Sequence, residues 1–206
     1  MSKVAHIIGN GDKVSLYEPS KGIKIACNIP PFPVNNLYAT VIVDFKMCRA
    51  LHEGEVTING SWLCGFRPKK YSEMHPSWYM KFAPQIKEFY TTIPKYTNIK
   101  GNDNLGQMYT NFNCGHLATH WAANKLKADE IHLYGFDSLF DWNMRSYTDL
   151  VIDSDRGNSN NHRLIDNWRP VWSGILKEFS NTQFVFYHNH DKLKIPKPEN
   201  VEIRVK

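Results

Sequence analysis

Residues 113–137 read NCGHLATHWAANKLKADEIHLYGFD, and they set the architecture of the chain. Across residues 115–127 the apolar side chains recur on one face at helical spacing, which predicts an amphipathic helix. Asn113 is suited to cap the first turn of this helix. After a short connection, residues 131–134 predict a buried strand. A helix followed so closely by a strand is half of a βαβ unit, so we predict a parallel sheet.

The rest of the chain alternates between short apolar runs and helical patterns. We predict strands at residues 3–8, 23–28, 38–43, 57–66 and 182–187, helices at residues 45–52 and 163–179, and an edge strand or tail at residues 192–206. Residues 72–90 are ambiguous because Pro76 and Pro84 interrupt a helical pattern, and residues 91–109 are polar and loop-like. A chain of 206 residues suits one domain, residues 1–206. We therefore predict a single α/β domain with a mostly parallel sheet and helices on both faces.

Small polar residues follow several of the predicted strands. Gly9-Asn10-Gly11 follows the first strand, and Asn28 and Asp44 end the next two. Gly135-Phe136-Asp137 follows the strand at residues 131–134. Parallel strands bring their carboxyl ends to one edge, where open sheets bind ligands, so we expect these residues to form one site. A purely structural role stays open, because glycine, asparagine and aspartate are common turn residues.

The composition favours an anionic ligand and a reducing compartment. The net charge of +5 suits a nucleotide, a phosphate or a nucleic acid, but the pI of about 8.9 is below that of a dedicated nucleic-acid binder. The four cysteines show neither a C-x-x-C pair nor zinc-finger spacing, which suits the cytoplasm. No targeting peptide and no apolar run of roughly 20 residues occurs, so we expect a cytoplasmic protein without a membrane partner. The sequence predicts no particular oligomeric state.

Several short motifs resemble a known family in their order along the chain. Gly9-Asn10-Gly11 resembles the Gly-Asn-Gly-Pro-Ser opening of the bacterial sialyltransferases of glycosyltransferase family 42, and of the related group similar to 6-hydroxymethylpterin pyrophosphokinase. Asn28 matches the end of their second strand, Cys114-Gly115 matches a helix start, and Gly135-Phe136-Asp137 matches a strand end. A lid and a histidine before a long helix follow, here residues 138–161 and His162. The chain departs from the pattern at Asp12, where the family has proline, and at Cys114, where it has serine.

This resemblance implies a Rossmann-like fold that binds a nucleotide sugar, such as a CMP-sugar carrying sialic acid, and needs no cofactor. The expected acceptor is a hydroxyl group on a glycan or small molecule, and the small size and positive net charge of the chain leave open a hydroxyl group on a base of DNA. The resemblance makes His162 the general base and places Tyr147 of the lid on the leaving phosphate. From the chemistry of such a transfer, Asp137 or Asp153 is suited to orient the histidine. The residues expected to bind the nucleotide are Gly9, Asn10, Gly11, Asn28, Asp44, Cys114, Gly115, Gly135 and Tyr147, with Arg145, Arg156 or Arg163 neutralising phosphate.

Other readings remain open. A pyrophosphokinase-like enzyme would need Mg²⁺ held by carboxylates such as Asp44 and Asp137, and a binding module would keep the nucleotide site without catalysis. If the chain is a glycosyltransferase, we assign no metal ligands. His116 and His120 have the spacing to bind a metal together with Asp137, but two histidines alone do not define a site. The pair His188 and His190 is less specific still, and we expect His6 and His132 to be core residues.

Overall fold

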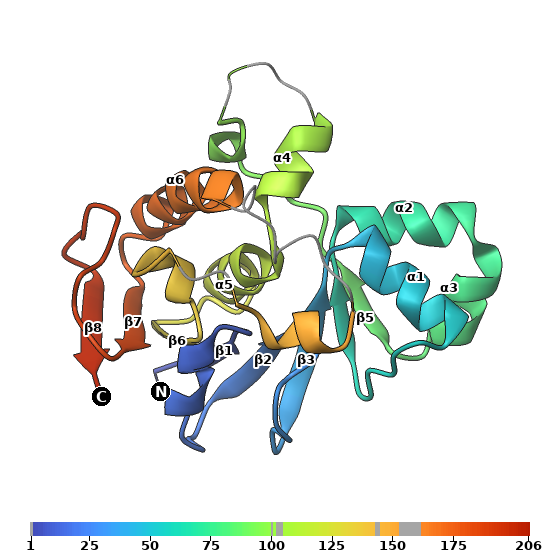
Figure 1. The fold of residues 1–206 in the computed structure, drawn as a ribbon, viewed down its shortest axis with the longest axis horizontal. Helices are drawn as coiled ribbons and strands as arrows, with labels where there is room; N and C mark the ends of the chain where they lie inside the picture. Colours follow the sequence, from blue (N-terminus) through green and yellow to red (C-terminus); the bar gives the residue numbers. More distant parts are fainter. Residues whose placement is uncertain (1, 100, 102–104, 143–144, 153–161) are drawn as a thin grey trace.

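Eight parallel strands form one sheet in the order β5-β4-β3-β2-β1-β6-β7-β8 (Figure 1). The computed structural model describes residues 2–99, 101, 105–142, 145–152 and 162–206. The strands are β1 (Val4–Ile8), β2 (Ile23–Cys27), β3 (Leu37–Ile42), β4 (Trp62–Cys64), β5 (Ile86–Phe89), β6 (Glu130–Tyr134), β7 (Gln183–His188) and β8 (Val201–Val205). Each strand runs parallel to its neighbours, which confirms the predicted α/β sheet and its Rossmann-like character.

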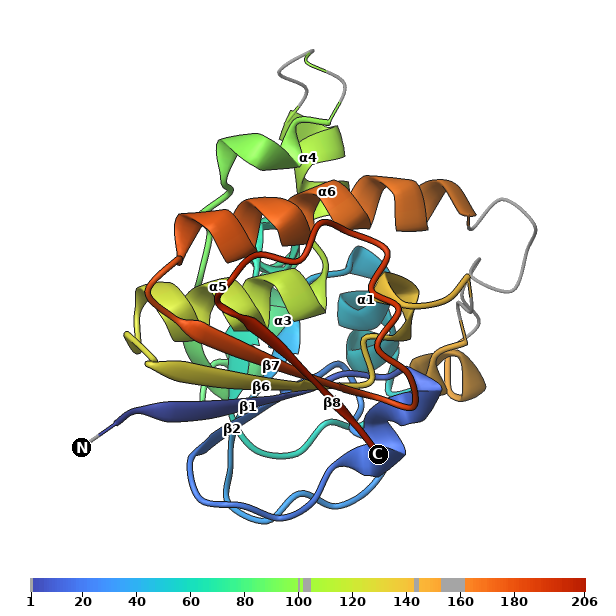
Figure 2. The ribbon, with the colours of Figure 1, turned by 90° about the vertical axis from the view of Figure 1, so that its left-hand side faces the viewer.

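Helices cover the two faces of the sheet unequally. The α-helices are α1 (Phe45–Glu53), α2 (Phe66–Met74), α3 (Pro76–Phe82), α4 (Leu105–Asn111), α5 (Cys114–Asn124) and α6 (His162–Glu178), and the 3₁₀ helices are η1 (Asp12–Leu16), η2 (Lys95–Thr97), η3 (Asp137–Leu139) and η4 (Tyr147–Leu150). Helices α5 and α6 lie on one face of the sheet, above the strands in Figure 2. Helices α1, α2 and α3 pack on the opposite face beside β4 and β5 (Figure 1).

The alternation of side chains along the strands builds a core on each face. In β3, Val41 joins the cluster under α5 and α6, whereas its neighbour Ile42 joins the cluster with α1 and α3. Trp172 of α6 and Trp78 of α3 are fully buried in these two clusters. Each face therefore has its own apolar packing, as a parallel sheet requires.

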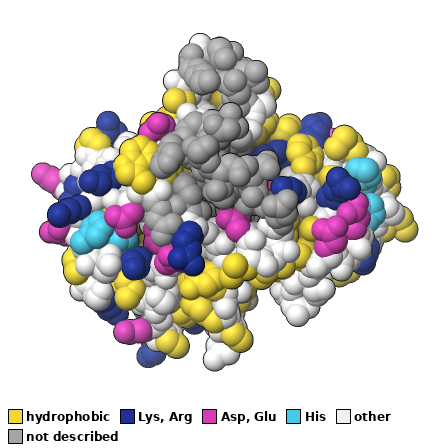
Figure 3. Space-filling model, viewed as in Figure 1, with side chains coloured by type: hydrophobic (Ala, Val, Ile, Leu, Met, Phe, Trp, Pro, Cys, Tyr) yellow, Lys and Arg dark blue, Asp and Glu magenta, His cyan; other side chains and the backbone are white. Residues whose placement is uncertain are grey.

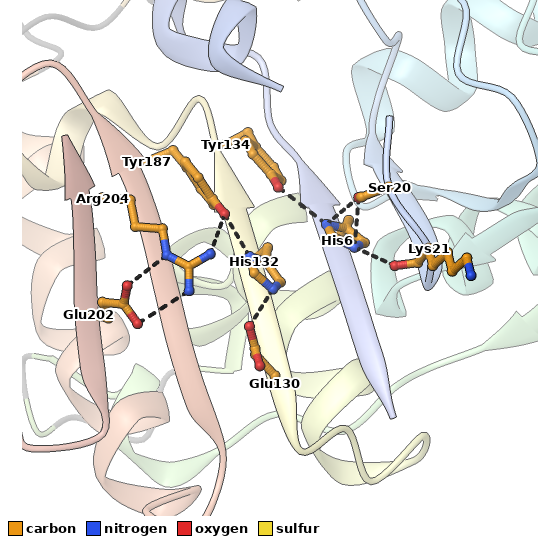
Figure 4. A network of polar contacts seen from close by, with 9 residues as sticks. All are labelled: His6, Ser20, Lys21, Glu130, His132, Tyr134, Tyr187, Glu202 and Arg204. Carbon is orange, nitrogen blue, oxygen red and sulfur yellow. Dashed lines mark hydrogen bonds and ion pairs between the residues drawn. The ribbon is translucent and has the colours of Figure 1, made fainter. Parts of the chain in front are cut away.

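The face opposite α5 and α6 is polar where β1, β2, β6 and β7 begin, and within the described residues no α-helix packs over it. His6 and His132 stack at 4.8 Å there, and both are buried as expected from the sequence. His6 also contacts Tyr134 Oη at 3.3 Å (Figure 4). On the next strand, His132 Nδ1 lies 3.0 Å from Tyr187 Oη, and its Nε2 lies 2.6 Å from Glu130. Hydrogen bonds thus satisfy polar groups that would be costly to bury alone.

Several predicted boundaries were wrong. The strand expected at residues 57–66 is confined to β4, because the chain turns at Gly65 and α2 begins at the next residue. The ambiguous residues 72–90 contain the end of α2, then α3 and β5, and Pro76 starts α3 at a position where proline is favourable. Residues 91–109 were expected to form a loop but include η2 and the start of α4. Among the described helices, none combines the length and apolar character needed to cross a membrane.

Candidate functional site

A cavity opens at the carboxyl edge of the sheet, between the ends of β1 and β6. Strand β1 lies between β2 and β6 in the sheet. The chain continues from β1 to one side and later adds β6 on the other side, so the loops that follow β1 and β6 run in opposite directions. The cavity measures about 660 Å³ including its open mouth. It is lined by Gly9, Asn10, Gly11, Asn28, Cys114, Gly115, Gly135 and Asp137 from the sequence prediction, together with Cys27, Asn113, Phe136, Ser138, Arg145, Ser146, Trp168 and Trp172. The ends of β1, β2 and β6, which were expected to meet, therefore border one cavity.

The glycines at this edge allow two loops to touch. A Cβ atom on Gly9 or Gly11 would lie 2.8 or 2.7 Å from the carbonyl oxygen of Gly135, far inside van der Waals contact. Gly11 N–H donates to that same carbonyl at 3.0 Å. Gly135 has a φ of 76°, a conformation that glycine adopts without strain. The close contact of the two loops therefore explains why glycine occupies these positions, with or without a ligand.

Asp137 supplies a carboxyl group that titrates near neutral pH. Its side chain is 4 % exposed at the start of η3, beside Gly11. Burial raises the pKa of Asp137 to about 6, and the backbone N–H of Lys13, 3.3 and 3.2 Å from its two carboxyl oxygens, opposes this rise. A carboxyl group with such a pKa, in a cavity, is suited to accept or donate a proton.

The two predicted asparagines are held by neighbouring loops. The Asn10 side-chain amide donates to the carbonyl of Ile29 at 2.9 Å. Asn28 adopts a left-handed backbone with φ of 53°, and its Oδ1 accepts a hydrogen bond from the Cys114 thiol at 3.2 Å. The amide groups are thereby fixed at the wall of the cavity, which reduces the entropy lost when a ligand is bound.

The first turn of α5 borders the cavity and is capped as predicted. Asn113 Oδ1 accepts from His116 N–H at 3.0 Å, and His116 Nδ1 accepts from Asn113 N–H at 3.1 Å. His116 Nε2 lies 3.2 Å from the carbonyl of Trp168, so both ring nitrogens have partners. His120 contacts Tyr90 Oη at 2.7 Å instead, and neither histidine lines the cavity with Asp137. The positive end of the α5 dipole is left to attract an anion.

Two predicted residues lie elsewhere. Asp44 precedes α1 and forms an ion pair with Arg67 at 2.6 Å, and it does not line the cavity. Tyr147 donates its backbone N–H to the carbonyl of Asn10 at 2.9 Å, but its side chain packs with the cluster around Ile8 rather than against the cavity. Local sequence pattern could not reveal the partner of Asp44, because Arg67 is remote in the chain.

The expected lid is described only in part. Arg145 and Ser146 line the cavity, and Arg145 Nη1 lies 4.0 Å from Asp12. His162 is the first residue of α6, but its side chain and that of Arg163 lie outside the described residues. Asp153 and Arg156, also expected to act at the site, fall in residues 153–161, outside the described chain.

Sequence reasoning missed several lining residues. Trp168 and Trp172 reach the cavity from α6, where their helical spacing favoured core packing over the stacking of a base or sugar on Trp168. Ser146 Oγ is buried and, among the residues that the structure describes, has no hydrogen-bond partner. A hydroxyl group in this state can serve a bound ligand. No sequence signal distinguishes Ser146 from other loop serines.

The topology and the cavity together define an α/β protein of Rossmann-like architecture with a cavity at the point where the strand order reverses. Comparison of the chain with protein-family models, with curated proteins and with solved structures gave no match. The resemblance to the sialyltransferases therefore stays a prediction, and function is argued from the site.

Proposed function

We propose that the cavity binds a nucleotide and that the protein transfers a sugar from a nucleotide donor, such as a CMP-sugar, to a hydroxyl acceptor. One observation carries this proposal: Asp137, with a pKa raised to about 6, lines the same cavity as the glycine turn after β1 and the first turn of α5. The site thus combines a proton acceptor with a helix end suited to a phosphate. The resemblance of the Gly9-Asn10-Gly11 opening supports the choice of a nucleotide sugar.

In the proposed reaction the acceptor hydroxyl attacks the sugar carbon that is bonded to the donor phosphate. The hydroxyl proton passes to a base, and the electrons of the broken carbon–oxygen bond pass to the phosphate. Asp137 is ionised at neutral pH and suited to the role of base, while the resemblance implies His162 for it. The first turn of α5 and Arg145 would stabilise the negative charge on the departing nucleotide.

The charges on the surface favour a small acceptor, and the cysteines favour a reducing compartment. On the face shown in Figure 3, lysine and arginine side chains are interspersed with acidic ones instead of forming one basic patch. A glycan or small-molecule hydroxyl therefore suits the site better than a nucleic acid. All four cysteines are unpaired and buried, which supports the cytoplasm as the place of action.

Binding and turnover of the Asp137→Asn and His162→Ala variants test this proposal. Calorimetry should show CMP binding more tightly than ATP or GTP. Loss of the base should lower transfer from the matching CMP-sugar by about 100-fold or more, with little change in CMP affinity. Asp191→Asn, an equivalent change at an exposed position, is the control. Transfer that is unchanged in both variants would refute a base at either position.

The pyrophosphokinase reading is less well supported, because Asp44 is paired with Arg67 outside the cavity. In that reading Asp44→Asn would abolish a Mg²⁺-dependent reaction with ATP. We expect instead that this substitution leaves CMP affinity unchanged and lowers stability by about 1 kcal/mol through loss of the ion pair. A binding module would bind CMP but transfer nothing from any CMP-sugar.

A further inference from the structure

A second group of side chains meets at the carboxyl edge of the sheet, beyond β6 and β7. Asp141 follows η3, and His188 and His190 lie at and just after the end of β7. His188 Nε2 lies 3.3 Å from Asp141 Oδ2, and His190 Nε2 lies 2.9 Å from Asp141 Oδ1. One nitrogen from each histidine and one carboxyl oxygen all fall within 4.8 Å of one another. None of the three residues lines the cavity described above.

His188 is the unusual member of this group. Its side chain is 1 % exposed and its ring stacks on Phe140 with centroids 4.2 Å apart. The contact with Asp141 lacks hydrogen-bond geometry, and within the described part of the chain neither ring nitrogen has a hydrogen-bond partner. A buried polar group without a partner is costly, so an imidazole held in this way calls for a ligand.

We propose that Asp141, His188 and His190 bind a divalent transition-metal ion of the zinc class. Two imidazoles and one carboxylate form a set that such ions accept, and a water molecule would complete the coordination. In a tetrahedral zinc site neighbouring ligand atoms are about 3.3 Å apart, since zinc–nitrogen bonds are roughly 2.0–2.1 Å. The separation of His188 Nε2 from Asp141 already has this value. Two nitrogen ligands disfavour Mg²⁺ and Ca²⁺, which prefer oxygen.

Metal binding would displace the proton that joins His190 to Asp141. In the metal-free arrangement His190 Nδ1 accepts from Lys192 N–H at 3.2 Å, so a neutral ring carries its proton on Nε2 and donates it to Asp141. Coordination through Nε2 by a neutral ring requires the tautomer with the proton on Nδ1, and this Nδ1–H can no longer accept from Lys192 N–H. His188 gives up no hydrogen bond, because it makes none among the described residues.

The accessibility of the group fits an exchangeable ion. The side chains of Asp141 and His190 are 43 % and 30 % exposed, whereas His188 forms the buried wall. Asp141 and His190 offer an open side for entry and for a water ligand. Arg169 donates to the carbonyl of Asp141 at 3.3 Å, which helps to hold the acidic residue in place.

Zinc titration of the full-length, chelator-treated protein tests the site. Calorimetry should give one equivalent of Zn²⁺ per chain with a rise in Tm. Bound Co²⁺ should show the intense absorption bands in the visible range that are typical of cobalt with four or five ligands. Asp141→Asn and His190→Ala should each weaken zinc binding by more than about 100-fold, because loss of an outer-shell partner alone costs roughly 10- to 100-fold.

Matched controls keep the outcome unambiguous. Asp191→Asn makes the same charge change at an exposed neighbour, and His75→Ala removes a histidine between α2 and α3, away from β7. Both should bind zinc like the unsubstituted protein. His188→Ala opens a buried space, so the more exposed Asp141 and His190 carry the test. Absence of stoichiometric binding, or binding that survives both Asp141→Asn and His190→Ala, would overturn the proposal.

Discussion

Protonation of Asp137 stabilises the folded state, because the carboxyl group is buried. Its folded-state pKa of about 6 exceeds the ordinary aspartate value of 3.8, so the folded chain binds more protons than the unfolded chain between these values. Its contribution is present below about pH 3.8 and is lost as the pH rises through about 6.

We therefore expect Asp137→Asn to gain stability, relative to the unsubstituted protein, as the pH rises from about 4 to about 7. A pKa difference of about two units corresponds to a gain of roughly 3 kcal/mol. Urea unfolding of both proteins across this range measures it. A difference in unfolding free energy that does not vary with pH would show that burial does not raise the pKa of this carboxyl.

The grouping of Asn10, Asn28 and Asp137 could be predicted because it depends only on strand direction. Parallel strands bring their ends to one edge, whatever the side-chain packing. The positions of Asp44 and Tyr147 could not be predicted in this way. Asp44 lies outside the cavity and is paired with Arg67, and the Tyr147 side chain is directed into an apolar cluster. Both outcomes depend on contacts between distant parts of the chain.

At the scale of elements, α5 lies close against the loop after β6. A Cβ atom on Gly115 would lie 2.3 Å from Cε1 of Phe136. Gly115→Ala should therefore cost about 1–3 kcal/mol of unfolding free energy, although alanine favours helices. Thermal or urea unfolding gives the value. In a Phe136→Leu background the same substitution should cost less, and an equal cost in both backgrounds would locate the strain elsewhere.

The strongly patterned elements were predictable, and the irregular ones were not. The sequence of α5 carries a helical apolar pattern and a cap, and the helix and its cap are present in the fold, but residues 114–123 are all buried, so the expected polar face is not exposed and the helix ends at Asn124 instead of residue 127. Strand β5 lies at the edge of the sheet, and its central residues alternate too little to signal a strand. No helix was predicted where α2 lies; its Pro68 is tolerated because it lies in the first turn, where the backbone N–H has no partner within the helix.

Across the whole molecule, buried histidines make the fold sensitive to acid. Burial lowers the pKa of His6, His120 and His132, and lowers that of His116 to about 3. The unfolded chain takes up protons as the pH falls below 6.5, whereas these folded-state rings stay neutral to lower pH. Their stabilising contribution is thus present above pH 6.5 and is lost on acidification.

We expect the unfolding free energy to fall between about pH 7.5 and about pH 5, with His116 alone contributing roughly 2 kcal/mol. His116→Gln keeps a capping side chain at the third helical position but cannot titrate. Its loss of stability over this range should be smaller than that of the unsubstituted protein. Equal losses, measured by urea unfolding, would exclude His116 as a source of acid sensitivity.

The strand order also governs how the chain can assemble during synthesis. Val4 of β1 pairs with Glu130 of β6. Strand β1 is synthesised first, but one of its two sides can form hydrogen bonds only after β6 has been synthesised. Strands β1 to β5 make up one half of the sheet and precede β6 in the chain, so this half-sheet leaves the ribosome before β6 does. Until β6 emerges, β1 is an unprotected margin of that half-sheet, and there the nascent chain is most open to mispairing.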